Sequence, residues 1–276
     1  MLKFIAFGDL EANQKAVRKI LDLDLASYNC AIFTGDIPNP EIFKKLSKQM
    51  VEAGLGELGN KPNIARETEP EWALKQIESE FRTIEPLFAR MKEKVKLIGV
   101  WGNADNTKIL DKVPIGQSII IVHSRAYQVR DTYILGYNGR PLYIFEKENK
   151  EQWAFTEEEI YSNLEREFKK LKGRKVILVS HDPPYGILDQ VVQEYRQYAV
   201  GTYGKRAKDG HIGSAGLRKI VDKYRPMLHV FGHIHEGKGV FVGQTTFVNT
   251  GGVGRDEEVA EISIMPEGIS VIFRKV

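Results

Sequence analysis

The chain has 276 residues, and its 40 basic and 37 acidic side chains leave a formal net charge of +3. Hydrophobic residues make up 42% and aromatic residues 10% of the chain, which supports a sizeable core and excludes a disordered protein. The length suits one large or two small domains. This net charge is too small to imply a nucleic-acid partner by itself. The substrate class must therefore be inferred from individual sites.

The cysteine content and the apolar runs favour a protein of the reducing cytoplasm. Cys30 is the single cysteine and lies in the apolar run CAIF, where a free thiol behaves as a small buried hydrophobic residue. The apolar stretch at the N-terminus is shorter than a signal-peptide core and runs straight into Asp9 and Glu11. The longest apolar run elsewhere, 119–122, is far below the ~20 residues that span a bilayer. We therefore expect no membrane partner.

Short apolar runs bounded by Gly, Pro or polar residues predict β-strands along the whole chain. Buried strands are predicted at 3–7, 31–33, 97–101, 119–122, 176–179 and 228–231. Further strands are predicted at 133–137, 240–242, 245–248, 259–264 and 269–273, and the last four are closely spaced as in an antiparallel meander. Helical spacing of apolar residues appears at 17–21 and again at 217–224. This alternation of strands and helices indicates α/β layering.

The segment 41–93 is predicted to be a helical insertion that packs on the sheet. Its ten acidic and nine basic residues nearly cancel, which argues against a nucleic-acid-binding arm. Pro86 interrupts the pattern, so we expect a kink, or a restart capped near Thr83. One apolar stripe at helical spacing runs through Ile77, Phe81, Ile84, Phe88 and Met91.

Five motifs place metal-capable residues directly after predicted strands. In open α/β sheets ligands bind beyond the carboxyl ends of the strands, so these loops can converge on one crevice. Carboxylates, an amide oxygen and imidazoles suit a borderline divalent ion such as Mn, Fe, Co, Ni or Zn. The motifs are GDLE (Asp9, Glu11), TGDI (Asp36), GNAD (Asn103, Asp105), SHDPP (His181) and GHIH (His233, His235).

Each motif alone also has a structural explanation. Gly-Asp after a strand is common turn chemistry, GNAD is compatible with a plain turn, and His181 with a simple loop residue. GHIH is more specific, because two histidines at alternate positions share a face. Five such motifs at five strand ends together favour a metal centre.

The order and content of these motifs resemble the calcineurin-like metallophosphoesterase superfamily, whose pattern is D-x-H, GD, GNH[DE], H and GHxH. The stretches SHDPPYG and RPMLHVFGHIHEG are similar to its Icc-like, metallophosphoesterase-domain branch. The resemblance spans nearly the whole chain and implies a single domain over residues 1–276. It implies an α/β fold, a four-layer αββα sandwich of two mixed sheets with helices outside. Segment 41–93 would then be an insertion between the second and third motifs.

The same resemblance implies two divalent metal ions bridged by Asp36, a pair that can activate water as hydroxide and bind two phosphate oxygens. One ion would take the further ligands Asp9, Glu11 and His235. The other would take Asn103, His181 and His233. Asp36 and His181 would act most directly in catalysis, together with His211, for the reason that follows.

Two positions depart from the family pattern. Glu11 replaces a metal-binding His, which should favour Mn or Fe, with Co, Ni or Zn as alternatives. Ala104 replaces a His that acts near the leaving group, and losing a general acid costs ~10²–10⁴-fold in rate. We expect a preference for phosphoanhydrides or aryl esters, or another acid. His211, in the Gly-flanked loop KDGHIGS, is the candidate acid, and a hydrogen-bonded loop histidine is the alternative interpretation.

Other polar residues invite weaker predictions. His123 and His229 lie in apolar runs and are expected to be structural, while Asp182 is expected to orient His181. The loop 195–208 interleaves aromatic and basic residues that would suit stacked bases and phosphates, although a solvated loop or the edge of a subunit interface is the favoured interpretation. Its residues of interest are Tyr195, Tyr198, Tyr203, Arg196, Lys205, Arg206 and Lys208.

The sequence thus predicts a cytoplasmic, metal-dependent phosphoesterase acting on a phosphodiester or a nucleotide-like small molecule. Ala104 motivates a first alternative, a catalytically weak family member that binds metal and phosphate. A second alternative is a nuclease of the same chemistry, which the mild net charge and the balanced 41–93 segment disfavour. The expected partner is a small phosphorylated substrate rather than nucleic acid, and a homo-oligomer is compatible with the sequence.

Overall fold

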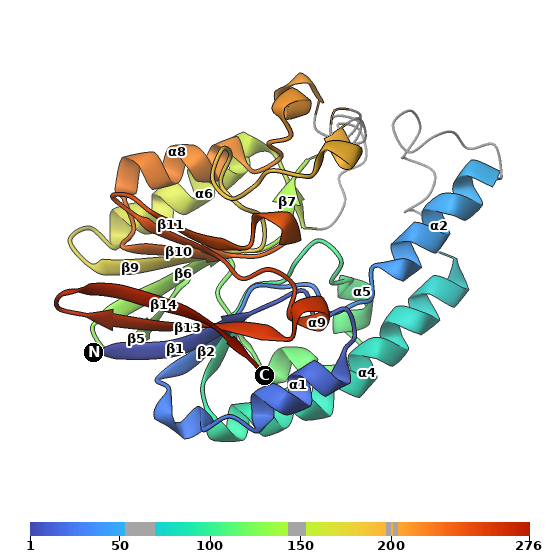
Figure 1. Ribbon diagram of the computed structural model, residues 1–276, viewed down its shortest axis with the longest axis horizontal. Helices are drawn as coiled ribbons and strands as arrows, with labels where there is room; N and C mark the ends of the chain where they lie inside the picture. The colour runs from blue at the N-terminus through green and yellow to red at the C-terminus, as the bar shows by residue number, and fades with distance from the viewer. Residues whose placement is uncertain (53–69, 143–152, 197–199, 201–203) are drawn as a thin grey trace.

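Two six-stranded sheets stack face to face in the computed structural model, which describes residues 1–52, 70–142, 153–196, 200 and 204–276 (Figure 1). The first sheet has the order β14 (Gly268–Lys275), β13 (Glu258–Met265), β1 (Leu2–Phe7), β2 (Cys30–Phe33), β3 (Leu97–Gly99) and β4 (Ile120–Ile121). The second has the order β11 (Gly239–Val242), β12 (Thr246–Asn249), β10 (Leu228–Phe231), β9 (Lys175–Ser180), β6 (Thr132–Tyr137) and β5 (Ala126–Val129). β7 (Arg140–Pro141) and β8 (Ala154–Phe155) form a small separate pair.

Both sheets are mixed, and the parallel strands carry the site. β1, β2 and β3 run parallel in the first sheet, whereas β13 is antiparallel to β1. In the second sheet β10 runs parallel to both β9 and β12, and β5 is antiparallel to β6. The parallel strands of each sheet therefore end at one edge, where the motif loops begin.

Alternation of side chains along the strands builds three apolar layers. In β1, Ile5 and Phe7 pack against the outer helices, whereas Phe4 and Ala6 point between the sheets. Successive side chains of a strand face opposite sides, so one apolar run serves two layers. This double burial explains why the runs are continuously apolar rather than alternating.

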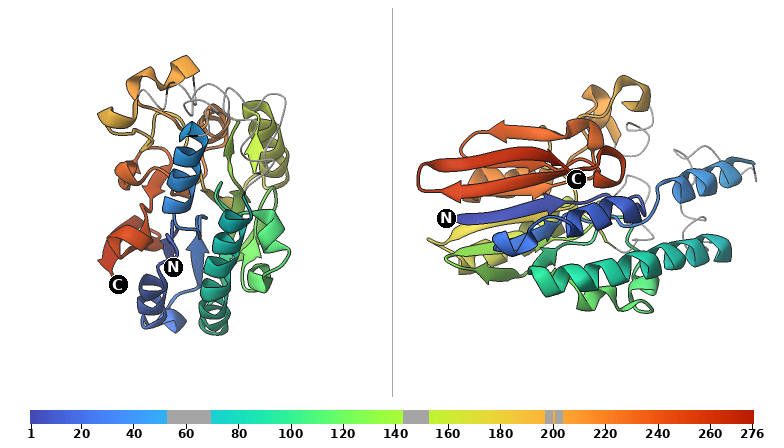
Figure 2. Two further views of the ribbon diagram at one scale, coloured as in Figure 1. Left: turned by 90° about the vertical axis from the view of Figure 1, so that its right-hand side faces the viewer. Right: turned by 60° about the horizontal axis from the view of Figure 1, so that its bottom comes forward.

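Helices cover both outer faces, which confirms the predicted four-layer architecture. On the first sheet, α1 (Gln14–Leu21) and α4 (Glu71–Lys94) lie side by side (Figure 2). α6 (Glu157–Lys170) and α8 (Ala215–Tyr224) share an apolar cluster with the second sheet. α6 was absent from the sequence prediction, although Thr156 and Glu159 form a capping box at its start.

The 41–93 segment contains α2 (Glu41–Glu52) and α4, and the predicted apolar stripe of α4 is fully buried. Phe88 packs against the rings of Phe7 and Phe33, at centroid distances of 6.4 and 5.4 Å. The expected restart near Thr83 is wrong, because α4 continues through Pro86 and the Thr83 hydroxyl donates to the Glu80 carbonyl. The free energy gained by burying one continuous apolar face of α4 exceeds the free energy lost with the backbone hydrogen bond that Pro86 cannot make.

Each predicted strand is present, but the C-terminal meander is wrong. β11 pairs with β12 and β13 with β14, each antiparallel, yet the two hairpins belong to different sheets. The short helix α9 (Val253–Asp256) lies between them in the chain. Spacing along the chain cannot reveal this change of sheet, because both hairpins have the same local pattern.

The thiol of Cys30 is buried, and burial raises its pKa to about 12, as expected for an unreactive core cysteine. Within the described ranges, we find no helix with the length and apolar character that crossing a bilayer requires.

Candidate metal centre

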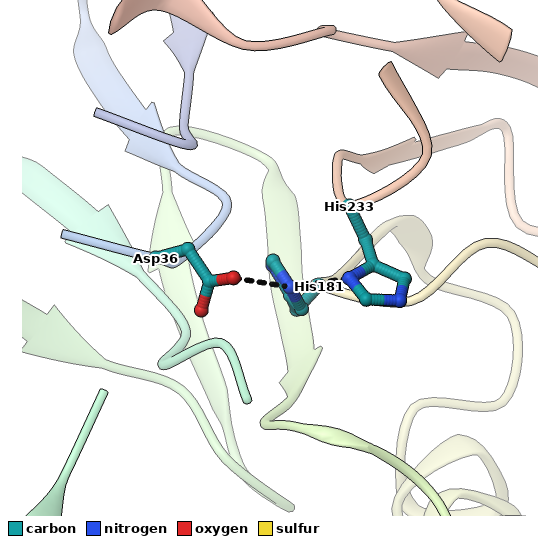
Figure 3. Close-up of side chains that lie close together, drawn as sticks. All are labelled: Asp36, His181 and His233. Atoms are coloured by element: carbon teal, nitrogen blue, oxygen red, sulfur yellow. Dashed lines mark hydrogen bonds and ion pairs between the residues drawn. The ribbon is translucent and has the colours of Figure 1, made fainter. Parts of the chain in front are cut away.

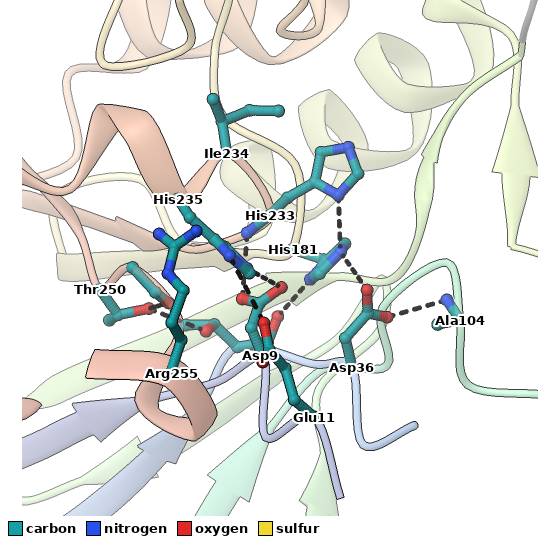
Figure 4. A network of polar contacts seen from close by, with 12 residues as sticks. Asp9, Glu11, Asp36, Ala104, His181, His233, Ile234, His235, Thr250 and Arg255 are labelled. Atoms are coloured by element: carbon teal, nitrogen blue, oxygen red, sulfur yellow. Dashed lines mark hydrogen bonds and ion pairs between the residues drawn. The ribbon is translucent and has the colours of Figure 1, made fainter. Parts of the chain in front are cut away.

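The five motif loops follow β1, β2, β3, β9 and β10 and meet at one edge of the sandwich (Figure 4). Their side chains come within hydrogen-bond distance across large separations in the chain. The backbone N–H of His233, for example, donates to Asp9 Oδ2 at 3.1 Å. The convergence predicted from the strand ends is therefore present in the fold.

Three polar atoms surround one ring nitrogen of His181. Nε2 of this buried histidine lies 3.0 Å from Asn103 Oδ1, 3.1 Å from His233 Nδ1 and 3.2 Å from Asp36 Oδ2. Figure 3 shows the carboxylate and the two imidazoles of this group. Asp36, His181 and His233 place one ligand atom each within 4.8 Å of one another.

The opposite ring nitrogen of His181 fixes its tautomer. Nδ1 lies 2.9 Å from the Thr34 carbonyl oxygen, which can only accept, so Nδ1 carries the proton. A neutral His181 then presents a lone pair at Nε2 toward the Asp36 carboxylate oxygen and the Asn103 amide oxygen, neither of which can donate a hydrogen bond. The Nδ1–H tautomer of His233 could donate to Nε2, but only a positive charge at Nε2, on a proton or a metal ion, also satisfies the two oxygens.

A proton on His181 can supply that charge. Burial by itself lowers the pKa of His181, but the Asp36 carboxylate outweighs it and raises the pKa to about 10. Burial likewise opposes ionisation of Asp36, and the contact with His181 lowers its pKa overall. Burial and the neighbouring His181 charge lower the pKa of His233 to about 3, so that ring is neutral.

The spacing of the four atoms fits a divalent metal ion equally well. An octahedral shell with bonds of about 2.1 Å separates adjacent ligand atoms by about 3.0 Å, close to the 3.0–3.2 Å seen around His181. Two imidazole nitrogens, a carboxylate and an amide oxygen match the donors that borderline divalent ions accept. The residues present therefore fit the metal that the motifs imply.

A second group of side chains lies beside the first. Asp9 Oδ1 is 3.0 Å from His235 Nε2, and Glu11 Oε1 is 3.8 Å from the other ring nitrogen, Nδ1. Burial lowers the pKa of His235, but the Asp9 carboxylate raises it overall. Asp9 and Glu11 thus contact opposite sides of one imidazole.

The buried carboxylate of Asp105 ties the loops after β2 and β3 together. It accepts backbone N–H bonds from Asp36 and Ile37 at 2.9 Å each and from Gly102 at 2.8 Å. Burial and the nearby Asp36 raise its pKa to about 7, although the three donors act in the opposite direction. The Ala104 N–H donates to Asp36 Oδ1 at 2.8 Å, so the Asp36 side chain is held on both sides.

Backbone strain is concentrated in this region. Positive φ values are found at Asp9 (49°), Glu11 (49°), Asp36 (60°) and His233 (67°). Left-handed backbone costs an L-residue about 1 kcal/mol or more at each position. Surrounding structure must hold these conformations, and strain of this kind gathers at functional sites.

Two motif glycines allow the loops to approach closely. A Cβ atom at Gly102 would lie 2.0 Å from Asp36 Oδ1, and one at Gly232 would lie 2.5 Å from Asp9 Oδ2. Any larger residue would displace these carboxylates. The requirement for Gly in GNAD and GHIH is thus steric.

Comparison with known proteins agrees with this geometry. Residues 2–237 match the family described as calcineurin-like phosphoesterase. The chain belongs to the calcineurin-like phosphoesterase family.

Relatives of this chain match it over part of their length. An uncharacterized protein of Methanocaldococcus jannaschii is 27% identical over 164 residues, which are 58% of this chain and 66% of that protein. Metallophosphoesterase domain-containing protein 1 of Homo sapiens is 40% identical over 75 residues, which are 26% of this chain and 19% of the human protein. The matches thus span less than two thirds of these relatives.

Solved structures share the fold. The phosphopantetheinyl hydrolase of Mycobacterium tuberculosis has a TM-score of 0.52 at 12% identity, covering 96% of this chain and 97% of that one. The likeness covers nearly all of both chains, so the two share their overall fold.

His211 lies apart from the two ligand groups, in a dyad that the sequence did not predict. Its Nδ1 is 2.6 Å from Asp189 Oδ1, and the fully buried Asp189 also accepts N–H bonds from Gly186 and Gly213. Asp189 carries no motif signal, because it stands in an ordinary loop sequence. Next to His211, Ile212 packs in an apolar cluster with Ile234, the residue between the two GHIH histidines.

Two arginines near the centre were also missed. Arg140 is almost fully buried, donates to the Pro141 carbonyl, and contributes to lowering the pKa of His233. Arg255 in α9 acts in the same way on His235, beside which it lies in Figure 4. In the sequence, Arg140 follows a strand end and Arg255 follows a Gly-rich turn. These features are too common to identify either arginine as a site residue.

The other histidines are structural, as predicted. The His229 ring contacts the Ser180 hydroxyl at 2.8 Å, and burial lowers its pKa to about 3. His123 Nδ1 accepts the Asn138 N–H at 3.0 Å, and burial lowers its pKa to about 4. The Asp182 carboxylate lies 3.7 Å from His233 Nε2, and its expected role in orienting His181 stays a prediction.

The predicted base-stacking loop 195–208 is described in part. Tyr198 and Tyr203, and the side chains of Lys205 and Arg206, lie outside the described residues. Tyr195 is exposed, as a solvated loop or a binding loop would require. Nucleotide stacking by this loop stays a prediction.

Gly102→Ala tests the steric requirement. We expect Mn²⁺ affinity to fall tenfold or more, because the new Cβ displaces Asp36, while overpacking lowers the free energy of unfolding by about 1–3 kcal/mol. Titration calorimetry with Mn²⁺ measures the first effect and denaturant unfolding the second. Gly116→Ala is the matched control, since a Cβ there meets no atom within 4 Å. Wild-type Mn²⁺ affinity in Gly102→Ala would contradict the packing argument.

Proposed function

We propose that this chain is a metal-dependent phosphoesterase that hydrolyses a phosphodiester or a nucleotide-like small phosphate compound. The observation that carries the proposal is the convergence of Asp36, Asn103 and His233 on Nε2 of His181. The His233 backbone N–H reaches the adjoining Asp9 and so joins this group to the second one. Family membership supports the reaction class, and the substrate is our own inference.

The two groups of side chains would hold two divalent ions. One ion would be held by Asn103, His181 and His233, the other by Asp9 and His235, and Asp36 would bridge them. Glu11 lies on the Nδ1 side of the His235 ring, opposite Asp9, so its side chain would have to turn to bind the same ion. When bound, such a pair supplies Lewis-acid activation of the phosphate and of the attacking water. The carboxylate at Glu11 favours Mn or Fe over Zn, with Co and Ni as further alternatives.

The chain itself contributes orientation and charge. The Thr34 carbonyl fixes the His181 tautomer, and Asp105 fixes the loop that carries Asp36. Partners of this kind set ligand direction and basicity. Arg140 and Arg255 add positive charge beside His233 and His235, which favours an anionic substrate and the charge that builds up during phosphoryl transfer.

We propose His211 as the proton donor, because Ala104 replaces the histidine that would have this role in the family. Asp189 holds the Nδ1 side of the ring at 2.6 Å, which leaves Nε2 as the nitrogen that can exchange a proton. The His211 side chain is 32% exposed, whereas Asp189 is fully buried. A buried carboxylate that orients a half-exposed imidazole is a common device for proton transfer. Asp189 is accordingly a positioning residue.

We further propose that the substrate has a good leaving group and that the protein works in the reducing cytoplasm. Ala104 stands where the family has its histidine, which favours phosphoanhydrides and aryl esters over alkyl esters. The buried, unpaired thiol of Cys30 fits a reducing compartment. The same alanine motivates the second candidate, a protein that binds metal and phosphate with little turnover.

Activity with Mn²⁺ separates these two candidates. Metal-stripped protein with added Mn²⁺ should hydrolyse bis-(p-nitrophenyl) phosphate or p-nitrophenyl phosphate, and Asp36→Asn should lower kcat at least 10²-fold because a bridging carboxylate is lost. Asp111→Asn, which alters an exposed carboxylate, should retain activity. Binding of Mn²⁺ without turnover of either ester would favour the binding protein.

Leaving-group dependence tests His211. We expect His211→Asn to lower kcat for phenyl phosphate about 10–100-fold more than for p-nitrophenyl phosphate, because the poorer leaving group needs the proton. Asp189→Asn should give a weaker form of the same difference between the two substrates. Equal losses on the two substrates would make His211 a structural residue.

A further inference from the structure

A basic cavity lies at the opposite end of the sandwich from the metal centre. It has a volume of about 600 Å³ and is bounded by the C-terminal ends of α6 and α8, by the first residues of β9 and by the two residues that precede β10. This is the left-hand end of the molecule in Figure 1. His181 and His233 follow the other ends of the same two strands. Since β9 has six residues at about 3.3 Å each, the cavity lies about 20 Å from the centre.

Cations dominate the wall of this cavity. Among the described residues that line it we find no acidic side chain. Three of the cations have ion-pair partners outside the wall, since Lys169 and Lys223 contact Glu165, and Lys175 contacts Asp131. Three further cations have no acidic partner within the described part of the chain, and these are Lys172, Arg174 and Arg225.

Helix dipoles account for only part of this charge. α6 and α8 both end at the cavity, and each C-terminus carries about half a negative charge that attracts nearby cations. Lys169 and Lys223 lie in those last turns and already serve this purpose. Lys172 and Arg174 lie beyond the end of α6, in the turn that leads to β9. Their charge is therefore in excess of what the helix ends require.

Arg225 adds a second observation. It ends α8 in the left-handed conformation, with φ 48° and ψ 59°. Glycine is the usual residue at such a position, and an L-residue there costs about 1 kcal/mol. The strained backbone at Arg225 thus places a guanidinium group at the cavity, beside the unpaired side chains of Lys172 and Arg174.

Apolar surface completes the cavity. Phe168 and Tyr224 stack nearly parallel, with centroids 4.9 Å apart and an interplanar angle of 15°. Leu171, Pro226 and Met227 line the same space. Phe168 and Pro226 are themselves buried, so the accessible apolar surface is that of the half-buried Leu171, Tyr224 and Met227. A flat apolar group can rest there while the cations reach charged groups beside it.

We propose that this cavity is a second ligand site, which binds a small organic polyphosphate of the nucleoside di- or triphosphate class. Three unpaired cations match the charge of two or three phosphates, and the apolar surface matches a base. The volume is within the roughly 300–1,000 Å³ typical of small-molecule pockets. The site is independent of the proposed phosphoesterase function, because it shares no residue with the metal centre.

Binding of ATP to the full-length protein in EDTA tests the proposal, since chelation removes any metal-dependent binding. Titration calorimetry should show one site, and Lys172→Glu with Arg174→Glu should weaken it tenfold or more. Both side chains are exposed, so the variant should fold, and its Tm should match the wild type. Arg18→Glu with Arg90→Glu reverses two exposed charges on α1 and α4, on the other face of the sandwich, and should leave ATP binding unchanged. Asp36→Asn should also leave it unchanged, so failure here is separable from failure of the catalytic proposal.

Four results would overturn the assignment. The first is no ATP binding at all, and the second is ATP binding that survives reversal of Lys172 and Arg174. The third is equal affinity for inorganic pyrophosphate, which would remove any role for the apolar surface. The fourth is tighter, steeply salt-dependent binding of a single-stranded oligonucleotide, which would make the basic surface a nucleic-acid site.

Discussion

Two oxygen atoms that cannot donate a hydrogen bond, Asn103 Oδ1 and Asp36 Oδ2, lie 3.0 and 3.2 Å from Nε2 of His181. The Thr34 carbonyl commits the only proton of a neutral His181 ring to Nδ1, so Nε2 has no proton to offer them. His233 Nδ1 completes the group at 3.1 Å. A proton satisfies this arrangement, and a divalent ion with bonds of about 2.1 Å satisfies it with the same spacing. The rest of the fold holds these atoms close together.

Close packing of the motif loops and strained backbone conformations hold the site together. The two sheets bring five strand ends to one edge, but the loops meet only because Gly102 and Gly232 leave room for the carboxylates of Asp36 and Asp9. Asp36 and His233 hold left-handed conformations against their intrinsic preference. Asp105 compensates in part with three backbone hydrogen bonds, which join the loops after β2 and β3. Burial of apolar side chains in three layers provides the stability from which these local costs are met.

Sequence patterns predicted the α/β layering and the ligand candidates because both leave local traces, whereas the four-layer sandwich was predicted from the family resemblance. A strand buried on two faces must be continuously apolar, and the candidate ligands follow such strands directly. The strand ends and the GHIH motif could therefore be predicted from the sequence. Contacts between segments far apart in the chain could not be predicted. The separation of β12 and β13 into different sheets, the continuity of α4 through Pro86 and the pairing of His211 with Asp189 all depend on tertiary packing. Glu11 was predicted beside His235, but its approach to Nδ1 rather than Nε2 is a matter of side-chain direction.

Crystals grown with Mn²⁺ and measured at the Mn absorption edge would test the central claim most directly. The account predicts two anomalous peaks about 3.5–4 Å apart. One should lie within bonding distance, about 2.0–2.3 Å, of His181 Nε2, Asn103 Oδ1 and His233 Nδ1, with Asp36 between the two. Mn²⁺ bound elsewhere, with those four side chains still in direct contact with one another, would contradict it.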